Sequence, residues 1–363
     1  MRSLWIVLSL FVGVLACTDR SQSPTTPAAM TIGTNRTVFA ATSRQPTKEG
    51  MYGSDRSQEL DLLELTVSIP PSHTPGALEF GYANPNPEKQ FVMAGRHKFS
   101  SVDAFQSKIR HSLSRLPPAQ QEVTVFVHGY NATQAETAFR AAQISNDIET
   151  PGAMVIYSWP SRAKALGYVY DNDSMLFARD GLEQLLYGIK ATGARRVVLV
   201  AHSLGSALVM ETLRQIELQK PGWAAKSLGG VILISPDLDV EVFRGQLDHL
   251  AKVPQPFVVF VSKKDTALNI SSRLRGRGRV RLGNISSVAE VADLPIEIVD
   301  TTAFSDTAGS SHFVPATSPA LISLLTQART LHDTFDSEHR SIDNLLTGNT
   351  INSGSAITLV VLR

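Results

Sequence analysis

One stretch of the chain constrains its fold more than any other: an apolar run that ends in Ala-His-Ser-Leu-Gly. The run covers residues 197–201 and leads into Ser203, and a pattern of apolar residues at helical spacing follows it. A strand, a serine and a helix in this order are typical of a nucleophile elbow, the sharp turn that presents a serine hydroxyl. Small side chains are needed two places before and after the serine, because larger ones clash across the turn. Gly205 meets this requirement, and Ala201 stands where glycine is usual.

Apolar runs alternate with helical patterns from about residue 60 to residue 300, and this alternation predicts the fold class. Residues 175–189 and 208–216 carry apolar side chains three and four positions apart, with Asp171, Asn172 or Asp173 as the N-cap of the first helix. Runs that are apolar throughout are typical of parallel strands buried on both faces. We therefore expect an α/β fold with a mostly parallel central sheet and helices on both faces. The predicted strands lie at residues 65–69, 123–127, 154–157, 197–200, 231–234, 257–261 and 296–299.

The composition limits the class of protein. With 363 residues, of which 43% are hydrophobic, the chain can bury a sizeable core. Its formal net charge of +1 provides no basic field for nucleic acid, so we expect no nucleic-acid partner. Cys17 is the single cysteine of the sequence, which excludes an intrachain disulfide and fits no cysteine-based metal site.

The N-terminus has the layout of a secretory signal. Arg2 precedes an apolar run from Leu4 to Ala16, which is too short for a membrane-spanning helix of roughly 20 residues. The run ends directly before Cys17, as in bacterial lipoproteins, so we expect residues 1–17 to be a lipoprotein-type signal peptide and Cys17 to carry a lipid. An ordinary secretory signal with an incidental cysteine is the alternative. The favoured interpretation predicts a protein of the bacterial cell envelope, anchored to a membrane (the outer membrane in a Gram-negative host).

Composition also divides the rest of the chain. Residues 18–50 are rich in Ser, Thr, Pro and Gln and hold few large apolar side chains, so we expect a flexible tether that can include a short strand over residues 37–40. The folded domain is expected over residues 51–335. A C-terminal tail follows over residues 336–363, and its strand-like run at 357–361 has no evident place.

A serine hydroxyl becomes a good nucleophile only when a neighbouring base removes its proton, and at such an elbow the chain order is serine, carboxylate, histidine. Asp265 follows the predicted strand at 257–261, and Asp237 follows the one at 231–234. Asp265 is favoured, because it lies two strands beyond the nucleophile strand. Its alternative role is the N-cap of a helix that starts near residue 266, and Asp237 is better explained as a cap or turn residue.

His312 is the favoured base, because it lies in a polar loop after the last predicted strand, and the small residues of this loop let it reach back over the strand ends. His202 adjoins the serine, but successive side chains at the elbow point apart, so we expect it to position the turn. His128 ends a strand and is expected to order the following loop by hydrogen bonding.

Two backbone N–H groups are expected to stabilise an oxyanion at this site. One belongs to Leu204, directly after the serine, and the other to Tyr130, in the loop after an earlier strand. Gly129 permits the tight backbone path that this loop needs. An ordinary strand-to-helix turn would explain Gly129 and Asn131 equally well.

Five ordered segments carry a resemblance to a known family. They read Phe-x-His-Gly-Tyr-Asn, Tyr-Ser-Trp-Pro-Ser, Ala-His-Ser-hydrophobic-Gly, Ser-Pro-Asp-hydrophobic-Asp and Ser-x-x-Asp-x-Ala-Leu, at residues 126–131, 157–161, 201–205, 235–239 and 262–268. With these segments the chain resembles an uncharacterised bacterial branch of the α/β-hydrolase superfamily from about residue 60 to residue 330. The resemblance implies the α/β-hydrolase fold, a catalytic triad of Ser203, Asp265 and His312, serine hydrolase activity, and no metal or organic cofactor.

Together these observations predict a carboxylesterase or lipase-like enzyme that forms a covalent acyl-enzyme on a small-molecule acyl ester. A non-catalytic envelope binding or scaffold lipoprotein on the same fold is the alternative, and Ala201 is its support. Amide or peptide hydrolysis by the same residues is a third interpretation. Residues 159–162 either line the pocket or form a packed loop. The five arginines within residues 273–281 belong to a solvated loop or meet an anionic substrate or lipid headgroups.

Overall fold

The computed structural model describes residues 20, 23–164, 166–274, 280–306, 310–323, 325 and 359–360. The predicted signal peptide with Cys17 and most of the predicted C-terminal tail lie outside these residues. No helix in the described part of the chain combines the length and the apolar character of a membrane span.

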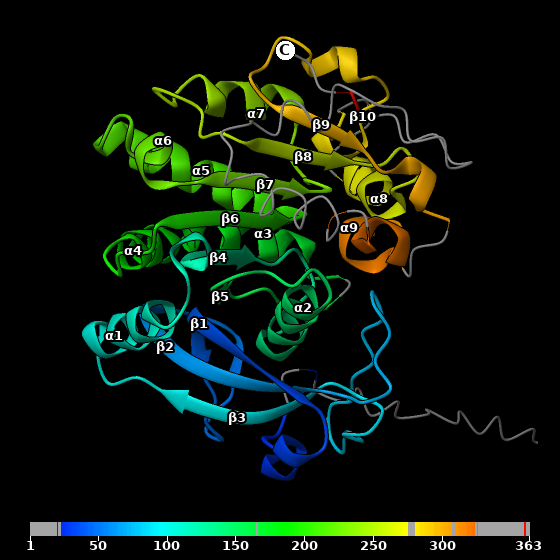
Figure 1. Ribbon diagram of the computed structural model, residues 1–363. Coiled ribbons are helices and arrows are strands. Elements are labelled where there is room, and N and C mark those ends of the chain that lie inside the picture. The colour runs from blue at the N-terminus through cyan, green and yellow to red at the C-terminus, as the bar shows by residue number, and fades with distance from the viewer. Residues whose placement is uncertain are drawn as a thin grey trace, which may run out of the picture.

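A twisted sheet forms the centre of the molecule (Figure 1), and its ten described strands follow the order β10-β9-β8-β7-β6-β4-β5-β1-β2-β3. The six neighbouring pairs from β9 to β1 are parallel, and β10, β2 and β3 join antiparallel at the two edges. This confirms the expected α/β-hydrolase fold with its mostly parallel sheet. The strands are β1 Thr34–Pro46, β2 Tyr52–Ile69, β3 Val92–Lys98, β4 Glu122–Val127, β5 Ala153–Ser158, β6 Arg196–His202, β7 Gly230–Ile234, β8 Phe257–Val261, β9 Glu297–Asp300 and β10 Leu359–Val360.

Helices cover both faces of the sheet, and each face has its own apolar cluster. One cluster joins the strands to α1, α3, α4, α5 and α7, and the other joins them to α2 and α9. The α-helices are α1 Val102–Ser114, α2 Gln134–Asp147, α3 Tyr168–Phe177, α4 Arg179–Lys190, α5 Leu204–Gln219, α6 Trp223–Ser227, α7 Val240–Leu247, α8 Thr266–Leu274 and α9 Val314–Thr317. Short 3₁₀ helices lie at Pro27–Thr31, Pro118–Gln120, Leu282–Asn284, Val288–Val291 and Thr302–Phe304.

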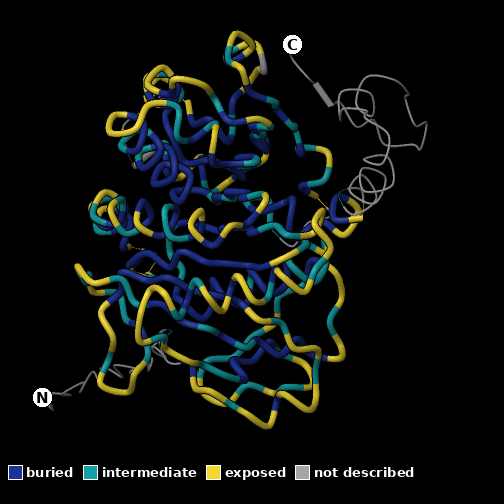
Figure 2. Tube along the Cα trace, turned by 60° about the vertical axis from the view of Figure 1, so that its left-hand side comes forward, coloured by how far each residue is buried: buried dark blue, intermediate teal, exposed yellow. Residues whose placement is uncertain are grey.

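The prediction of a flexible tether over residues 18–50 is wrong for residues 34–46. Residues 34–46 form β1, an inner strand that pairs with β2 on one side and with β5 on the other. Phe39 and Ala41 enter one apolar cluster, and Val38 and Ala40 enter the other. Figure 2 shows the buried residues concentrated along such inner strands. The short strand considered over residues 37–40 lies within β1, whose apolar residues alternate between the two faces of the sheet. The low apolar content of the whole segment hid the length of this strand, and the folded domain therefore begins before residue 51.

The sequence predicts one helix over residues 175–189, but the structure has two helices there, α3 and α4, which meet at Ala178. The residue at the N-cap of α3 is Gly167, and Asp171, Asn172 and Asp173 all lie within the helix, so none of the three candidates is the N-cap. Asp171 is fully buried. The strand-like run in the C-terminal tail, which had no evident place, contributes β10 at the edge beside β9.

Candidate active site

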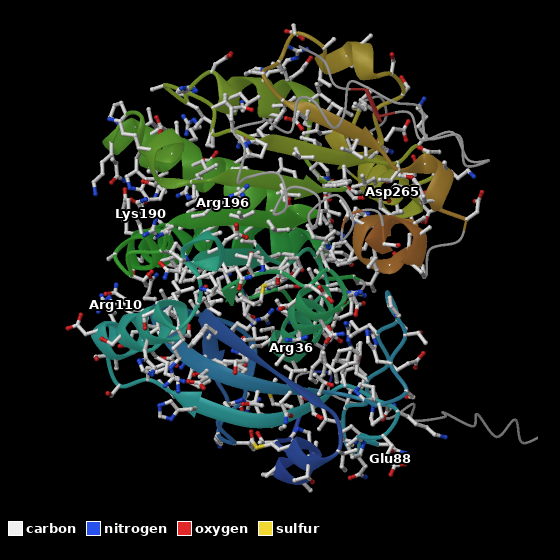
Figure 3. All side chains as sticks on the ribbon, in the orientation of Figure 1. Arg36, Glu88, Arg110, Lys190, Arg196 and Asp265 are labelled. Atoms are coloured by element: carbon white, nitrogen blue, oxygen red, sulfur yellow. The ribbon has the colours of Figure 1, made fainter. Side chains whose placement is uncertain are left out.

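The predicted nucleophile elbow is present at the carboxyl end of β6. Ser203 has φ 54° and ψ −124°, a backbone conformation that side chains other than glycine rarely adopt. Its N–H donates to the carbonyl oxygen of Ile234 at 2.9 Å, and its carbonyl oxygen accepts from the N–H of Asp237 at 3.2 Å. These hydrogen bonds join the strained turn, which connects β6 to α5, to the end of β7 and to the segment that follows it. Figure 3 shows Asp265 at this end of the sheet and Arg196, which begins β6, at the other end.

Two glycines let the loop after β4 pack directly against the elbow. A Cβ atom on Gly205 would lie 2.3 Å from the carbonyl oxygen of His128, and one on Gly129 would lie 2.8 Å from Cβ of Ser203. Neither position accepts a side chain without backbone movement. Ala201, by contrast, is fully buried in β6 and keeps its register with both neighbouring strands. The elbow therefore forms with alanine in place of the usual glycine.

The favoured acid and the favoured base lie together. Nδ1 of His312 is 2.7 Å from Oδ2 of Asp265, whose side chain is fully buried, while 19% of the His312 side chain is exposed. The other carboxylate oxygen, Oδ1, accepts from the N–H of Leu268 at 3.0 Å in the first turn of α8. The two roles considered for Asp265, partner of a histidine and N-cap of a helix, are thus both filled, one by each oxygen.

Asp237, the alternative acid, belongs to a different buried network. Its carboxylate accepts from the hydroxyl of Tyr168 at 2.7 Å and from the hydroxyl of Ser271 at 2.6 Å. Nε of Arg281 lies 3.3 Å from Oδ1, an ion pair with 2% and 3% of the two side chains exposed. Asp237 therefore links α3, α8 and the segment before β9. It is not the cap or turn residue that its sequence position suggested.

His202 supports the loop that carries His312 through one hydrogen bond. Its Nε2 lies 3.1 Å from the carbonyl oxygen of His312, and since a carbonyl only accepts, Nε2 carries the proton. Burial, followed by the charge of His312, holds the pKa of His202 well below its usual value, so the ring stays neutral. Its ring also packs on Phe313 at 4.2 Å between centroids. These contacts hold the loop that carries His312, whereas the sequence predicts that His202 positions the elbow turn.

His128 orders the start of the loop after β4, as expected. Its ring stacks on Trp159 at 4.8 Å with an interplanar angle of 6°, and Nδ1 lies 2.7 Å from the carbonyl oxygen of Gly129. Burial and the neighbouring charge of Arg44 lower the pKa of His128 to about 3. Trp159 is fully buried and its indole N–H donates to the carbonyl oxygen of His128 at 2.8 Å, so the packed-loop interpretation of Trp159 is correct.

The loop that holds Tyr130 is braced by residues for which the sequence indicated no such role. The N–H of Asn131 donates to Oδ2 of Asp171 at 3.3 Å, and the carbonyl oxygen of Ala132 accepts from Arg44 at 2.8 Å. We call residues 128–132, which include the predicted oxyanion donor Tyr130, the oxyanion loop. Leu204, the other predicted donor, is the first residue of α5, where a backbone N–H has no acceptor within the helix.

Three charged residues form hydrogen bonds with the oxyanion loop, and each of them lies far from this loop in the sequence. Arg44 is buried, and burial lowers its pKa to about 10 although the charges of Asp171 and Glu136 raise it. Asp171 also accepts from the hydroxyl of Ser161 at 2.5 Å. Arg20 bonds the loop from the N-terminal side. No local pattern indicates this role for any of the three, because their partners lie far along the chain.

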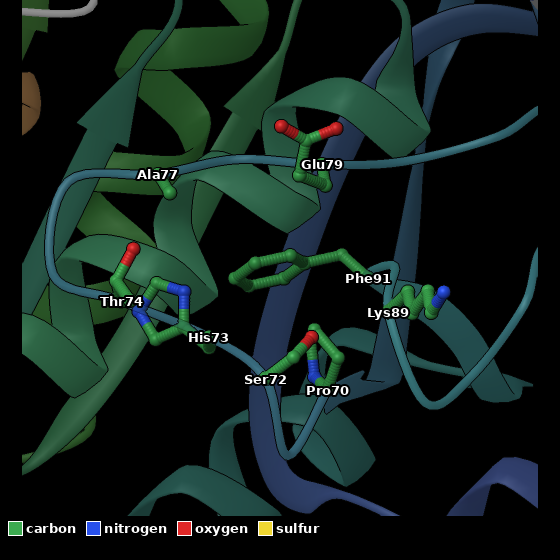
Figure 4. Close-up of a pocket in the computed structure, with 8 residues that line it drawn as sticks. All are labelled: Pro70, Ser72, His73, Thr74, Ala77, Glu79, Lys89 and Phe91. Atoms are coloured by element: carbon green, nitrogen blue, oxygen red, sulfur yellow. The ribbon is translucent and has the colours of Figure 1, made fainter.

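A pocket of about 230 Å³ lies away from these residues, in the connection between β2 and β3 (Figure 4). Its lining is Pro70, Ser72, His73, Thr74, Ala77, Glu79, Lys89 and Phe91. His73 extends from this pocket to Asp147 of α2, with 2.6 Å between Nε2 and Oδ1. None of the predicted catalytic residues contributes to it. Within the described residues, no cluster of histidine, cysteine and carboxylate side chains could hold a metal ion.

Part of the predicted arginine run lies outside the described residues, which omit 275–279. Arg281, at the end of the run, is buried in its ion pair with Asp237, so at this position the solvated-loop interpretation is wrong.

Comparisons with known proteins found a family model and several solved structures that are similar to this chain. A family model described as "Alpha/beta hydrolase of unknown function (DUF900)" matches residues 101–329, more than half of the chain. Similar solved structures include lipase B from Aspergillus fumigatus, at 12% identity and TM-score 0.36, over 58% of this chain and 52% of that one. An α/β-hydrolase enzyme from the metagenome of Lake Arreo has 9% identity and TM-score 0.34, over 88% and 86%. A dienelactone hydrolase from Anabaena variabilis has 11% identity and TM-score 0.34, over 77% and 93%.

The chain spans about half the length of the lipase, 52%, and most of the length of the other two structures. No curated protein matches it. The family model covers the elbow, the loop that carries His312 and the strands between them. The chain therefore belongs to the α/β-hydrolase family of unknown function (DUF900).

Proposed function

We propose that the protein is a serine hydrolase that cleaves carboxylic esters. The observation that carries this proposal is the 2.7 Å contact between Nδ1 of His312 and Oδ2 of Asp265, beside an elbow that presents Ser203. A histidine held in this way keeps its proton on Nδ1 and leaves Nε2 to act as a base. The ring of His312 lies 4.7 Å from that of His202, the residue directly before the serine.

In the proposed reaction, these residues act as a serine triad does. Oγ of Ser203 attacks the ester carbonyl carbon while Nε2 of His312 takes the serine proton. The imidazolium then gives that proton to the leaving alcohol as the bond between carbonyl carbon and alkoxide oxygen breaks, which leaves an acyl-enzyme. Water attacks the acyl-enzyme by the same route and releases the acid. Asp265 stabilises the charged imidazole during both steps.

The negative oxygen that forms in each step needs donors that are already in place. The N–H groups of Leu204 and Tyr130 fit this role, because Gly205 packs against His128 and Gly129 packs against Ser203, which brings the two elements together. The bonds of Asn131 and Ala132 to buried charged residues fix the direction of the adjoining peptide groups.

The proposal includes the N-terminal anchor. The sequence from Arg2 to Cys17 supports lipid attachment at Cys17, and hence a place for the enzyme at the surface of a bacterial membrane. Mass spectrometry of the full chain made in a bacterial host would show a lipid on Cys17 and loss of residues 1–16. A Cys17→Ser chain that fractionates with the membrane as the wild type does would contradict the anchor.

A fluorophosphonate probe tests the hydrolase proposal directly. We expect the probe to label the wild-type chain at Ser203 and to leave Ser203→Ala unlabelled. Ser206→Ala is the matched control, because Ser206 is a fully buried serine of the same turn whose hydroxyl bonds the carbonyl oxygen of Ala201. A folded wild type that is not labelled and is inert on esters would favour the non-catalytic binding protein instead.

A further inference from the structure

Arg20 connects the N-terminal segment to the oxyanion loop. Its Nη1 donates to Oδ1 of Asn131 at 2.7 Å, and its Nη2 donates to the carbonyl oxygen of the same residue at 3.0 Å. Nη1 also donates to the carbonyl oxygen of Ala163 at 2.9 Å. An ion pair at 2.8 Å with Glu136, in the first turn of α2, fixes the guanidinium. We call this set of contacts the Arg20 clamp.

The Arg20 clamp lies very close to the proposed lipid anchor in sequence. Arg20 is the third residue after Cys17. An extended chain spans at most about 3.6 Å per residue, so a lipid attached to Cys17 starts within about 11 Å of the Cα atom of Arg20. The anchor therefore meets the domain beside the oxyanion loop and not at a remote surface.

The segment that the clamp bonds exposes apolar side chains. We call residues 162–164 and 166–170 the rim segment. Leu166 and Val169 in this segment are 99% and 79% exposed, the two highest values among large apolar residues of the described chain. The rim segment lies against the oxyanion loop, because the hydroxyl of Tyr130 donates to the carbonyl oxygen of Lys164 at 3.2 Å and its ring packs on Tyr168 at 5.4 Å.

The same segment exposes positive charge. Arg162 and Lys164 are both exposed, close in sequence to Leu166 and Val169. Apolar side chains next to exposed basic residues are the combination that binds the interface of a bilayer with anionic headgroups.

We propose that the Arg20 clamp and the rim segment hold the oxyanion-loop side of the active site against the membrane that carries the anchor. The substrates are then acyl esters presented by that membrane, not esters dissolved in water. This inference rests on the proposed esterase function and on the lipid at Cys17.

The test uses the full lipidated chain, reconstituted in vesicles of phosphatidylcholine and phosphatidylglycerol. Two fluorogenic substrates are compared: a soluble short-chain ester, and a long-chain acyl ester embedded in the same vesicles. We expect the vesicle-borne ester to be cleaved at least ten-fold faster at equal total concentration. The quantity followed in every variant is the rate on the vesicle-borne ester divided by the rate on the soluble ester, which we call the ratio.

Two changes act on the proposed geometry. A flexible insert of ten Gly and Ser residues between Thr18 and Asp19 lets the anchor move away from the clamp by roughly 18 Å. A Leu166→Ser/Val169→Ser chain removes the apolar contact. We expect each change to lower the ratio at least five-fold. Val102→Ser/Leu218→Ser is the matched control, because these side chains are 55% and 60% exposed on other helices, and it should leave the ratio within two-fold of the wild type.

Arg20→Ala breaks the clamp itself. We expect it to lower the ratio and also to lower kcat on the soluble ester about ten-fold with little change in KM, because Asn131 loses two bonds. Arg244→Ala is its control: Arg244 has a similar ion pair, with Asp293 at 2.6 Å, and a similar exposure of 33% against 31% for Arg20. It should change neither quantity.

The outcomes separate this inference from the proposed function. A wild type that cleaves neither ester and is not labelled by fluorophosphonate contradicts the hydrolase proposal. A wild type that cleaves the soluble ester as fast as the vesicle-borne one overturns the membrane inference and leaves the hydrolase proposal intact. A ratio that survives both the insert and the Leu166→Ser/Val169→Ser change overturns it as well.

Discussion

At the scale of single residues, Asp265 shows how one side chain fills two structural roles. Oδ2 lies against Nδ1 of His312 while Oδ1 caps α8 through Leu268. The cap fixes the carboxylate at the end of β8, so its other oxygen meets the histidine in one orientation. A carboxylate held in this way restricts the tautomer and the rotation of the imidazole.

Asp265→Asn and Asp237→Asn should fail in different ways. An amide at position 265 still accepts a bond but cannot stabilise imidazolium, so kcat should fall about 10³–10⁴-fold with little change in melting temperature. An amide at position 237 leaves the buried guanidinium of Arg281 without its counter-charge, which should cost about 3–5 kcal/mol of stability. Ester turnover and urea unfolding measure the two effects. A larger loss of turnover in a folded Asp237→Asn chain would assign the acid to Asp237.

Acid should destabilise the protein through His128. Its pKa is about 3 in the folded chain, and an unfolded histidine has about 6.5, so the unfolded state binds the extra proton as the pH falls. The stability present at pH 8 should therefore drop by about 2 kcal/mol at pH 5 from this residue alone. Urea unfolding at the two pH values checks the prediction. His128→Gln should reduce the drop by that amount, whereas His111→Gln, at an exposed position of α1, should not.

At the scale of elements, the junction between α5 and the loop after β4 decides the geometry of the site. Gly205→Ala would place Cβ 2.3 Å from the carbonyl oxygen of His128, so one element has to shift. We expect about 1–3 kcal/mol of destabilisation and a large loss of kcat, because the two proposed oxyanion donors lie on these two elements.

Gly245→Ala is the control for this substitution. It lies within α7, and a Cβ there would meet nothing within 4 Å, so alanine should raise stability by about 0.5–1 kcal/mol. Thermal unfolding and ester turnover of both variants provide the comparison. Full activity and unchanged stability in Gly205→Ala would contradict the prediction, because they would show that α5 and the loop after β4 can move apart without loss of function.

The elements also show which parts of the fold can be predicted from sequence. The elbow, the central strands and the pairing of His312 with Asp265 follow from local patterns and chain order, and their catalytic roles stay a prediction. Arg20 and Arg44 could not be found in this way, because their bonds to the oxyanion loop cross 111 and 88 residues of sequence. The sequence offers Asp171 only as one of three candidate caps, because polar residues before an apolar helical pattern usually are caps.

At the scale of the whole molecule, the N-terminal segment is part of the sheet. A chain that starts at residue 18 should fold and keep its turnover of soluble ester. A chain that starts at residue 51 loses β1, and with it the partner of both β2 and β5, so it should be insoluble or lack a cooperative melting transition. Circular dichroism and thermal unfolding of the two chains test this. A well-folded chain from residue 51 would show that β1 is dispensable.

The position of β1 also has a consequence for synthesis. Thr42 of β1 bonds the backbone of Ser158 in β5, a partner 116 residues later. As the polypeptide leaves the ribosome, the apolar residues of β1 emerge long before β5 exists, and contacts between such distant residues form slowly. Until β5 is made, this unpaired strand can pair with strands of other copies of the chain and aggregate. The yield of soluble protein should therefore depend on a chaperone that covers the nascent N-terminal strand.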